Sequence, residues 1–182
     1  MNNQNIPEKK QKNNSALNLH MNLAMQNGLK LSALFGIQAL SMLLYRFGFI
    51  SSLLFIFGFV AVPVYIVLLG NQYRDKYLSG RIRYFQAVGF LTWCYLFSLI
   101  IATVIFFVVF TILFRDSYFL NMMDESILVM EDILQNSQKS TEIINSIRML
   151  TPKSMTFQFA ISALFFGTIY IYIVGIFIRR KA

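Results

Sequence analysis

Residues 85–114 decide the fold, and they read FQAVGFLTWCYLFSLIIATVIFFVVFTILF. These 30 residues carry no charge, and 19 of them are Phe, Leu, Ile or Val. Each such residue favours insertion into a bilayer by roughly 0.3–0.6 kcal/mol, so together they contribute about 8 kcal/mol. As a helix the stretch is roughly 45 Å long, whereas the hydrocarbon core is about 30 Å thick. It therefore predicts a transmembrane helix that tilts or projects beyond the membrane.

Three further apolar stretches accompany it. Residues 49–70 and 155–178 are uncharged over 22 and 24 residues, which meets the requirement of roughly 20 residues for a crossing. Pro63 should kink the first of these two, because it lacks an N–H and its ring is bulky. The remaining stretch reaches 23 residues only if it begins at residue 23 and includes Lys30. We predict four spans, at about 23–45, 49–70, 85–114 and 155–178.

Lys30 is the unusual residue of the first span. A lysine near a helix end can lay its stem along apolar surface while its ammonium reaches the headgroups. We expect that arrangement, and the alternative is an ion or substrate contact inside the membrane.

The composition places the chain in the class of all-α, polytopic membrane proteins. Hydrophobic residues make up 57% and charged residues only 13%, against about 25% charged in soluble domains. Such a chain would expose too much apolar surface in water. The net charge of +8 indicates attraction to anionic lipid headgroups, and we expect no binding of nucleic acid.

The basic residues predict the orientation. Ten lie on one side of the four spans and five on the other, with Lys30 as an eleventh on the first side. By the positive-inside rule both termini are cytoplasmic. An even number of spans likewise requires the two termini to lie on the same side. We expect a polar, partly disordered tail over residues 1–22 and a basic end over 179–182. The cytoplasmic candidates for lipid-headgroup contact are Arg74, Lys76, Arg81, Arg83, Arg179, Arg180 and Lys181.

No catalytic, cofactor or metal site is predicted. Cys94 is the single cysteine and lies within the third span, and His20 is the single histidine and has no neighbouring ligand in the sequence. A protein metal site needs three or four such groups. We expect Cys94 to pack in the bundle and His20 to be a surface imidazole.

Residues 115–154 form the sizeable segment outside the spans. Apolar residues recur every three or four positions from Leu120 to Leu134 and again from Ile143 to Leu150, which is typical of amphipathic helices. A break is expected at residues 136–140. We expect this segment to cap the third span; it could instead lie in the headgroup region or bind a partner.

Small residues predict where the spans pack. Side chains of this kind recur every four residues in the first and fourth spans and permit close backbone approach, within the chain or in a homo-oligomer. Polar residues in the spans, such as Gln38, suit hydrogen bonds between helices. The small residues are Ala24, Gly28, Ser32 and Gly36, with Ala163 and Gly167.

The basic loop from Tyr73 to Phe85, followed by Gly89, resembles the central signature of domain-of-unknown-function family forty-one ninety-nine. Thr151-Pro152 before the last span and the Arg179-Arg180-Lys181 ending fit the same pattern. The resemblance implies a small bacterial inner-membrane protein with four spans and no established activity.

Three functional hypotheses follow. We expect a non-enzymatic accessory or scaffold protein of the cell envelope that has a membrane-protein partner. The alternatives are a small transporter or channel, and a membrane enzyme or accessory subunit that acts on lipid-linked substrates through its basic loop.

Overall fold

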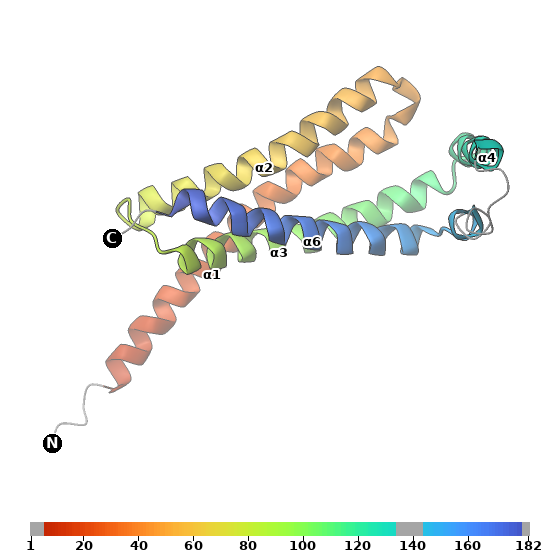
Figure 1. Ribbon diagram of the computed structural model, residues 1–182. Helices are drawn as coiled ribbons and strands as arrows, with labels where there is room; N and C mark the ends of the chain where they lie inside the picture. Colours follow the sequence, from red (N-terminus) through yellow and green to blue (C-terminus); the bar gives the residue numbers. More distant parts are fainter. Residues whose placement is uncertain (1–5, 134–143, 180–182) are drawn as a thin grey trace.

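The computed structural model describes the backbone of residues 6–133 and 144–179, and the side chains of residues 20–131 and 144–179. Every regular element in these ranges is a helix (Figure 1). Residues 144–148 are also helical. The other elements are α1 (Ile6–Leu43), the 3-10 turn η1 (Tyr45–Phe47), α2 (Phe49–Tyr77), α3 (Tyr84–Leu113), α4 (Ser117–Ile133) and α6 (Pro152–Ile178).

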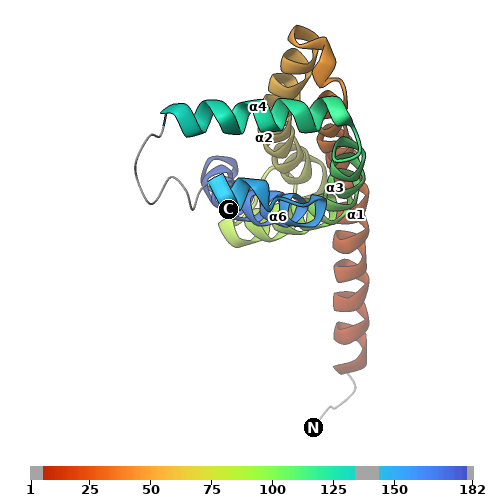
Figure 2. The same cartoon turned by 90° about the vertical axis from the view of Figure 1, so that its right-hand side faces the viewer.

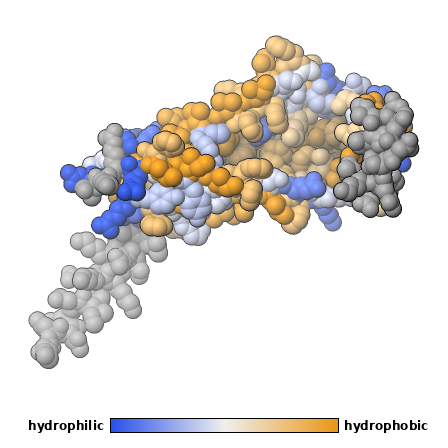
Figure 3. All heavy atoms as spheres, viewed as in Figure 1, coloured by the Kyte–Doolittle hydropathy of each residue, from blue (hydrophilic) through white to orange (hydrophobic). Residues whose placement is uncertain are grey.

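Four of the helices form an up-and-down bundle. α1, α2, α3 and α6 run in alternating directions, and the first part of α1 projects beyond the bundle (Figure 1). α4 lies across the end at which α3 stops and α6 begins, and Figure 2 shows it along its length. Both ends of the described chain lie toward the opposite end of the bundle. Apolar residues cover the middle of the visible face and hydrophilic residues gather at its two ends (Figure 3).

Three of these helices are long and apolar enough to cross a membrane. They are α2, α3 and α6, with 29, 30 and 27 residues. Within its described residues, α1 does not meet the same requirement of length and hydropathy. Its first half is rich in Asn, Gln and Lys, and Lys30 interrupts the apolar half, so its length is sufficient but its hydropathy is low.

α1 differs from the expected division into a partly disordered tail and a first span. The helix begins at Ile6 and continues to Leu43 without a break. Pro7 occupies the first turn, where its missing N–H costs nothing. The Lys and Gln residues that follow are good helix formers. Residues 1–5 lie outside the described range.

The ends of α3 and α6 follow from capping residues. The backbone N–H of Arg83 donates to Gln86 Oε1 at 3.3 Å, at the start of α3. Thr151 caps α6, where its Oγ1 accepts from the backbone N–H of Ser154 at 3.2 Å. Pro152 takes the first helical position, which suits its fixed φ. α6 therefore begins three residues before the stretch chosen on hydropathy alone.

The core lies where α3 meets α1 and α6. Leu31 and Phe35 of α1 and Leu91 and Phe106 of α3 are buried there. Phe106 also stacks on Phe159 of α6, with ring centroids 3.8 Å apart. Because close packing replaces the hydrophobic drive that lipid cannot supply, this interface is the main source of cohesion between the helices.

Small residues allow α1 and α6 to approach α3 closely. A Cβ added at Gly28 would lie 2.8 Å from the carbonyl oxygen of Cys94, and one at Gly167 would overlap the ring of Tyr95. Ala24 and Ser32 are buried on the same side of α1. At Gly36 an added Cβ would meet its nearest neighbour only at 4.0 Å. The close contact is therefore centred on Gly28.

Candidate functional site

A lateral gap lies between α2 and α6. Two cavities of about 440 and 510 Å³ lie one after the other along it. The first is near the α1–α2 turn and the second is deeper, where α2 passes Pro63. Apolar side chains dominate both walls, so the gap suits an apolar occupant.

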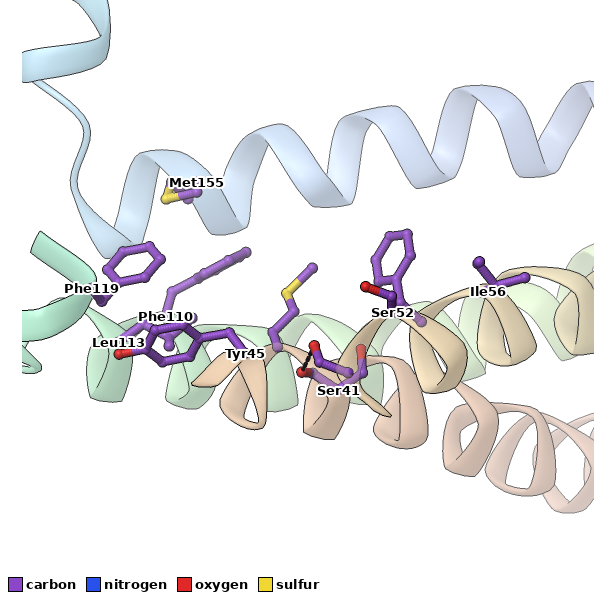
Figure 4. Close-up of a pocket in the computed structure, with 11 residues that line it drawn as sticks. Ser41, Tyr45, Ser52, Ile56, Phe110, Leu113, Phe119 and Met155 are labelled. Atoms are coloured by element: carbon purple, nitrogen blue, oxygen red, sulfur yellow. Dashed lines mark hydrogen bonds between the residues drawn. The ribbon is translucent and has the colours of Figure 1, made fainter. Parts of the chain in front are cut away.

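The outer cavity has a polar corner. It is lined by residues of α1, α2, α3 and α6 together with Phe119 of α4, and Figure 4 shows them converging. The Ser51 hydroxyl donates to the carbonyl oxygen of Ser41 at 2.7 Å, which ties the start of α2 to the end of α1. Ser52 similarly donates to the Gly48 carbonyl at 3.0 Å. Both hydroxyls therefore have partners within the protein.

The inner cavity contains an amide with no partner. Gln38 of α1 lines it and is buried. Its side-chain amide makes no hydrogen bond within residues 20–131 and 144–179. On the other wall, Ser162 and Gly167 of α6 present little side-chain bulk. No fully buried side-chain N or O in the described residues lacks a partner, so this amide is open to the cavity. It offers two donors and one acceptor there, and lipid tails pair with none of them.

Pro63 also lines the inner cavity. α2 continues through it as one helix from Phe49 to Tyr77. The Tyr170 hydroxyl donates to the Pro63 carbonyl at 3.1 Å, and this bond links α6 to α2 beside the cavity. The kink at Pro63 stays a prediction.

A cluster of polar and aromatic side chains joins the α1–α2 turn to the start of α4. The Tyr45 hydroxyl donates to Asp116 Oδ2 at 2.7 Å, and Arg46 pairs with the same carboxylate at 2.8 Å. The Arg46 guanidinium also lies over the ring of Tyr118, 5.3 Å from its centroid. The Tyr45 hydrogen bond, aided by the Tyr118 amide and Arg46, lowers the pKa of Asp116. This junction holds α4 against the end of the bundle.

Beyond the junction, α4 shows a mixed pattern of burial. Of its expected inner stripe, Ile127 is buried, Leu120 and Met123 are partly buried, and Met130 is exposed. Arg148, the last residue of the helical stretch 144–148, pairs with Glu131 of α4 at 2.7 Å. The expected break at residues 136–140 and the Leu134 and Ile143 positions lie outside the described residues.

The basic residues at the other end have unequal environments. Arg74 is buried, its Nε lies 2.7 Å from Asp75 Oδ1, and its Nη1 donates to the carbonyl oxygen of Ile178. It therefore binds within the protein and links α2 to the end of α6. The others within the described range are exposed, and Arg180 and Lys181 lie outside it. The exposed ones are Lys76, Arg81, Arg83 and Arg179.

Lys30 and Lys76 meet at a small cavity that the sequence did not predict. The cavity measures about 130 Å³ and lies between α1 and α2, with Phe90 of α3 behind it. His20, expected to be a surface imidazole, is exposed, and its Nδ1 forms a short hydrogen bond with the Tyr73 hydroxyl. Neither pairing has a sequence signal, because each joins helices whose relative rotation is set by packing.

Among the described residues, no three His, Cys, Asp or Glu side chains lie close enough together to hold one metal ion. Cys94, in the same part, is buried and not in a disulfide.

Comparison with known proteins places the chain in a family. No curated protein and no solved structure matches it significantly. A family model described as "Protein of unknown function (DUF4199)" matches residues 26–180, which include the basic loop, Thr151-Pro152 and Arg179. This match confirms the resemblance noted from the sequence. Because it covers well over half of the chain, the protein belongs to this family of unknown function.

Proposed function

We propose that the protein is a non-enzymatic accessory or scaffold protein of a bacterial inner membrane, and that its lateral gap receives a transmembrane helix of a partner protein. Gln38 is the observation that carries the proposal. Gln38 lines the apolar inner cavity, and its amide forms no hydrogen bond within the described residues. Because no fully buried side-chain N or O among those residues lacks a partner, the amide is open to the cavity. A lipid chain would leave that amide unsatisfied, whereas a polar side chain on a neighbouring helix would pair with it.

We propose α1 as the fourth span. Leu31, Phe35 and Ala39 of α1 are buried in the bundle core beside α3. α1 also turns directly into α2 through η1, so its second half runs antiparallel to a helix that can cross the membrane. A helix packed along the full depth of the bundle is shielded from lipid on one side, and this offsets its lower hydropathy.

The distribution of charge supports placing both termini in the cytoplasm. The loop that contains Arg81 and Arg83 lies at the same end of the bundle as Arg179, because Arg74 bonds to the Ile178 carbonyl. Such an excess of basic residues is typical of the cytoplasmic side. The α4 end carries Asp116, Asp124, Glu125 and Glu131. A bacterial inner membrane is what the family resemblance implies.

The length of the gap matches most of a transmembrane helix. Its two cavities are lined by α2 from Ser51 to Ile66, and at about 1.5 Å per residue this is roughly 22 Å. That length is about three quarters of the hydrocarbon core. Ser162, Ala163 and Gly167 on the α6 wall are small, and small residues are typical of helix interfaces in membranes.

Photo-crosslinking tests the proposal. Benzoylphenylalanine replaces Phe166, which lines the gap and is 68% exposed, or Phe57, which is 57% exposed on α2 but does not line it. We expect the Phe166 position to crosslink to a transmembrane helix of one membrane protein, identified by sequencing the joined peptide. The Phe57 position should not give that product.

Gln38→Leu provides the second arm. Hydrogen bonds between transmembrane helices contribute about 0.6–2 kcal/mol, so this variant should weaken the association by roughly 3- to 30-fold. If Phe166 gives only lipid adducts, or the same products as Phe57, the gap does not hold a partner helix. An unchanged yield of the crosslinked product with Gln38→Leu would show that the amide does not contribute to the association.

A further inference from the structure

We propose that the cavity between α1 and α2 at the basic end of the bundle binds the phosphate group of an anionic ligand through Lys30 and Lys76. The cavity is lined by α1 residues Gln26, Asn27 and Lys30 and by α2 residues Gln72 and Lys76. Its volume is about 130 Å³, which suits a small headgroup and excludes a bulky one.

The two lysines are available for an anion. Neither forms an ion pair with any residue in the described ranges. The closest acidic residue in the sequence, Asp75, is bound by the Arg74 guanidinium through Nε at 2.7 Å and Nη2 at 3.1 Å. The Asp75 carboxylate is therefore already bonded to the neighbouring guanidinium.

The donors in the cavity match a phosphate. An ammonium group offers three N–H donors and no acceptor, and each side-chain amide adds two more donors. Phosphate oxygens accept several hydrogen bonds at once, and lysine binds them as a point charge. Two cations on different helices, with Gln26, Asn27 and Gln72 between them, thus favour an anion rich in acceptors.

The back wall of the cavity is rigid and apolar. Tyr73 stacks on Phe90 with ring centroids 3.8 Å apart and an angle of 9° between the planes. Tyr73 is also held by its hydrogen bond to His20. A fixed apolar wall excludes water from one side of the ligand, and this strengthens the attraction between the lysines and an anion.

The position of the cavity suggests a lipid as the source of the phosphate. Lys76 lies in the last turn of α2, at the end of a helix that can cross the membrane. If the bundle spans the membrane as proposed, this turn lies near the headgroups. Only the depth of the cavity in the membrane rests on the proposed function. The chemistry of the cavity does not depend on that placement.

The test uses the full chain in detergent micelles, with binding followed by native mass spectrometry. The probes are short-chain phosphatidylglycerol, diacylglycerol with the same tails and no phosphate, and inorganic phosphate. The variants are Lys30→Gln, Lys76→Gln and the double substitution. Lys153→Gln is the matched control, because Lys153 is exposed at the opposite end of the bundle. Lys30→Arg and Lys76→Arg retain the charge and report on folding.

Each basic residue near an anionic lipid contributes about 1 kcal/mol, so each Gln variant should weaken phosphatidylglycerol binding about 5-fold and the double variant about 30-fold. Both Arg variants should bind nearly as well as the native chain, and diacylglycerol binding should not change. Inorganic phosphate that competes at similar affinity would assign the site to free phosphate, whereas weak competition would assign it to a lipid.

Unchanged phosphatidylglycerol binding by the double variant would overturn the inference. An equal loss in Lys153→Gln would overturn it too, because the effect would then be one of overall charge. The assay needs neither a partner protein nor a membrane orientation. Its failure would leave the lateral gap proposal standing, and failure of the crosslinking experiment would leave this one standing.

Discussion

Gly28→Ala tests how closely α1 packs against α3, and Gly36→Ala in the same helix controls for the change in helix propensity. Gly28→Ala places a Cβ 2.8 Å from the Cys94 carbonyl oxygen and from Phe97 Cβ, whereas Gly36→Ala meets its nearest neighbour, Ile105, at 4.0 Å. Both substitutions are in the same helix and gain the same roughly 0.5–1 kcal/mol from replacing glycine. Their difference therefore reports the contact between α1 and α3.

Overpacking of this kind costs about 1–3 kcal/mol. The obstacle at Gly28 is backbone, so it cannot rotate away as the end of a side chain can. For a chain of this length, 1 kcal/mol shifts the melting temperature by about 2–4 °C. Gly28→Ala should therefore melt roughly 2–12 °C below Gly36→Ala in the same detergent, measured by circular dichroism.

One result of this comparison would contradict the prediction. If Gly28→Ala is as stable as Gly36→Ala, or more stable, then α1 does not approach α3 closely at this position. The packing of α1 in the bundle, and with it the case for α1 as a span, would lose its main support.

Three further variants test other contacts. The pKa of Asp116 is lowered, so the stabilisation from its carboxylate is present above the ordinary value of 3.8 and is lost as the pH falls below it. Limited proteolysis of the connection between α3 and α4 should therefore increase in acid, and Asp116→Asn should remove that pH dependence together with the pairing to Arg46. Arg74→Gln should lower the melting temperature through loss of charged hydrogen bonds, each about 1.5–3 kcal/mol; an unchanged melting temperature would show that the buried guanidinium is not structural. Tyr95→Phe removes the 2.7 Å hydrogen bond from its hydroxyl to the Ala163 carbonyl and should destabilise the chain by about 0.5–1.5 kcal/mol, whereas a gain in stability would contradict this contact.

The helices of the bundle are largely predictable from the sequence. α3 occupies Tyr84–Leu113, within one residue of the uncharged stretch, because no charge or proline interrupts that stretch. α6 ends at Ile178, where the basic residues begin. α1 is less predictable, since its apolar half is short and its first half contains no long apolar stretch.

Most contacts between helices could not be predicted from the sequence. Arg74 looked like a member of a basic loop, yet it is buried and bonded to the Ile178 carbonyl, more than a hundred positions away. Lys30 and Lys76 share a cavity for a similar reason. Periodicity gives the face on which a residue lies, but the rotation and tilt of each helix depend on how its neighbours pack.

The role of Gln38 could be predicted only in part. Its polar side chain within an apolar stretch indicated a hydrogen bond between helices. The structure places the amide in a cavity instead, without a partner in the described residues. The sequence could identify the residue but not the cavity beside it, because that cavity depends on how α1, α2 and α6 pack around Gln38.

The central claim is that the chain crosses the membrane four times with both ends in the cytoplasm, and the side on which α1 begins tests it most directly. In a Cys94→Ala background, single cysteines at Asn14 and Phe47 are treated in intact cells with a maleimide that cannot cross the inner membrane. Phe47 is exposed in the α1–α2 turn. We expect labelling at position 47 and protection at position 14. Labelling at both positions, or protection at both, would place them on one side and show that α1 does not cross.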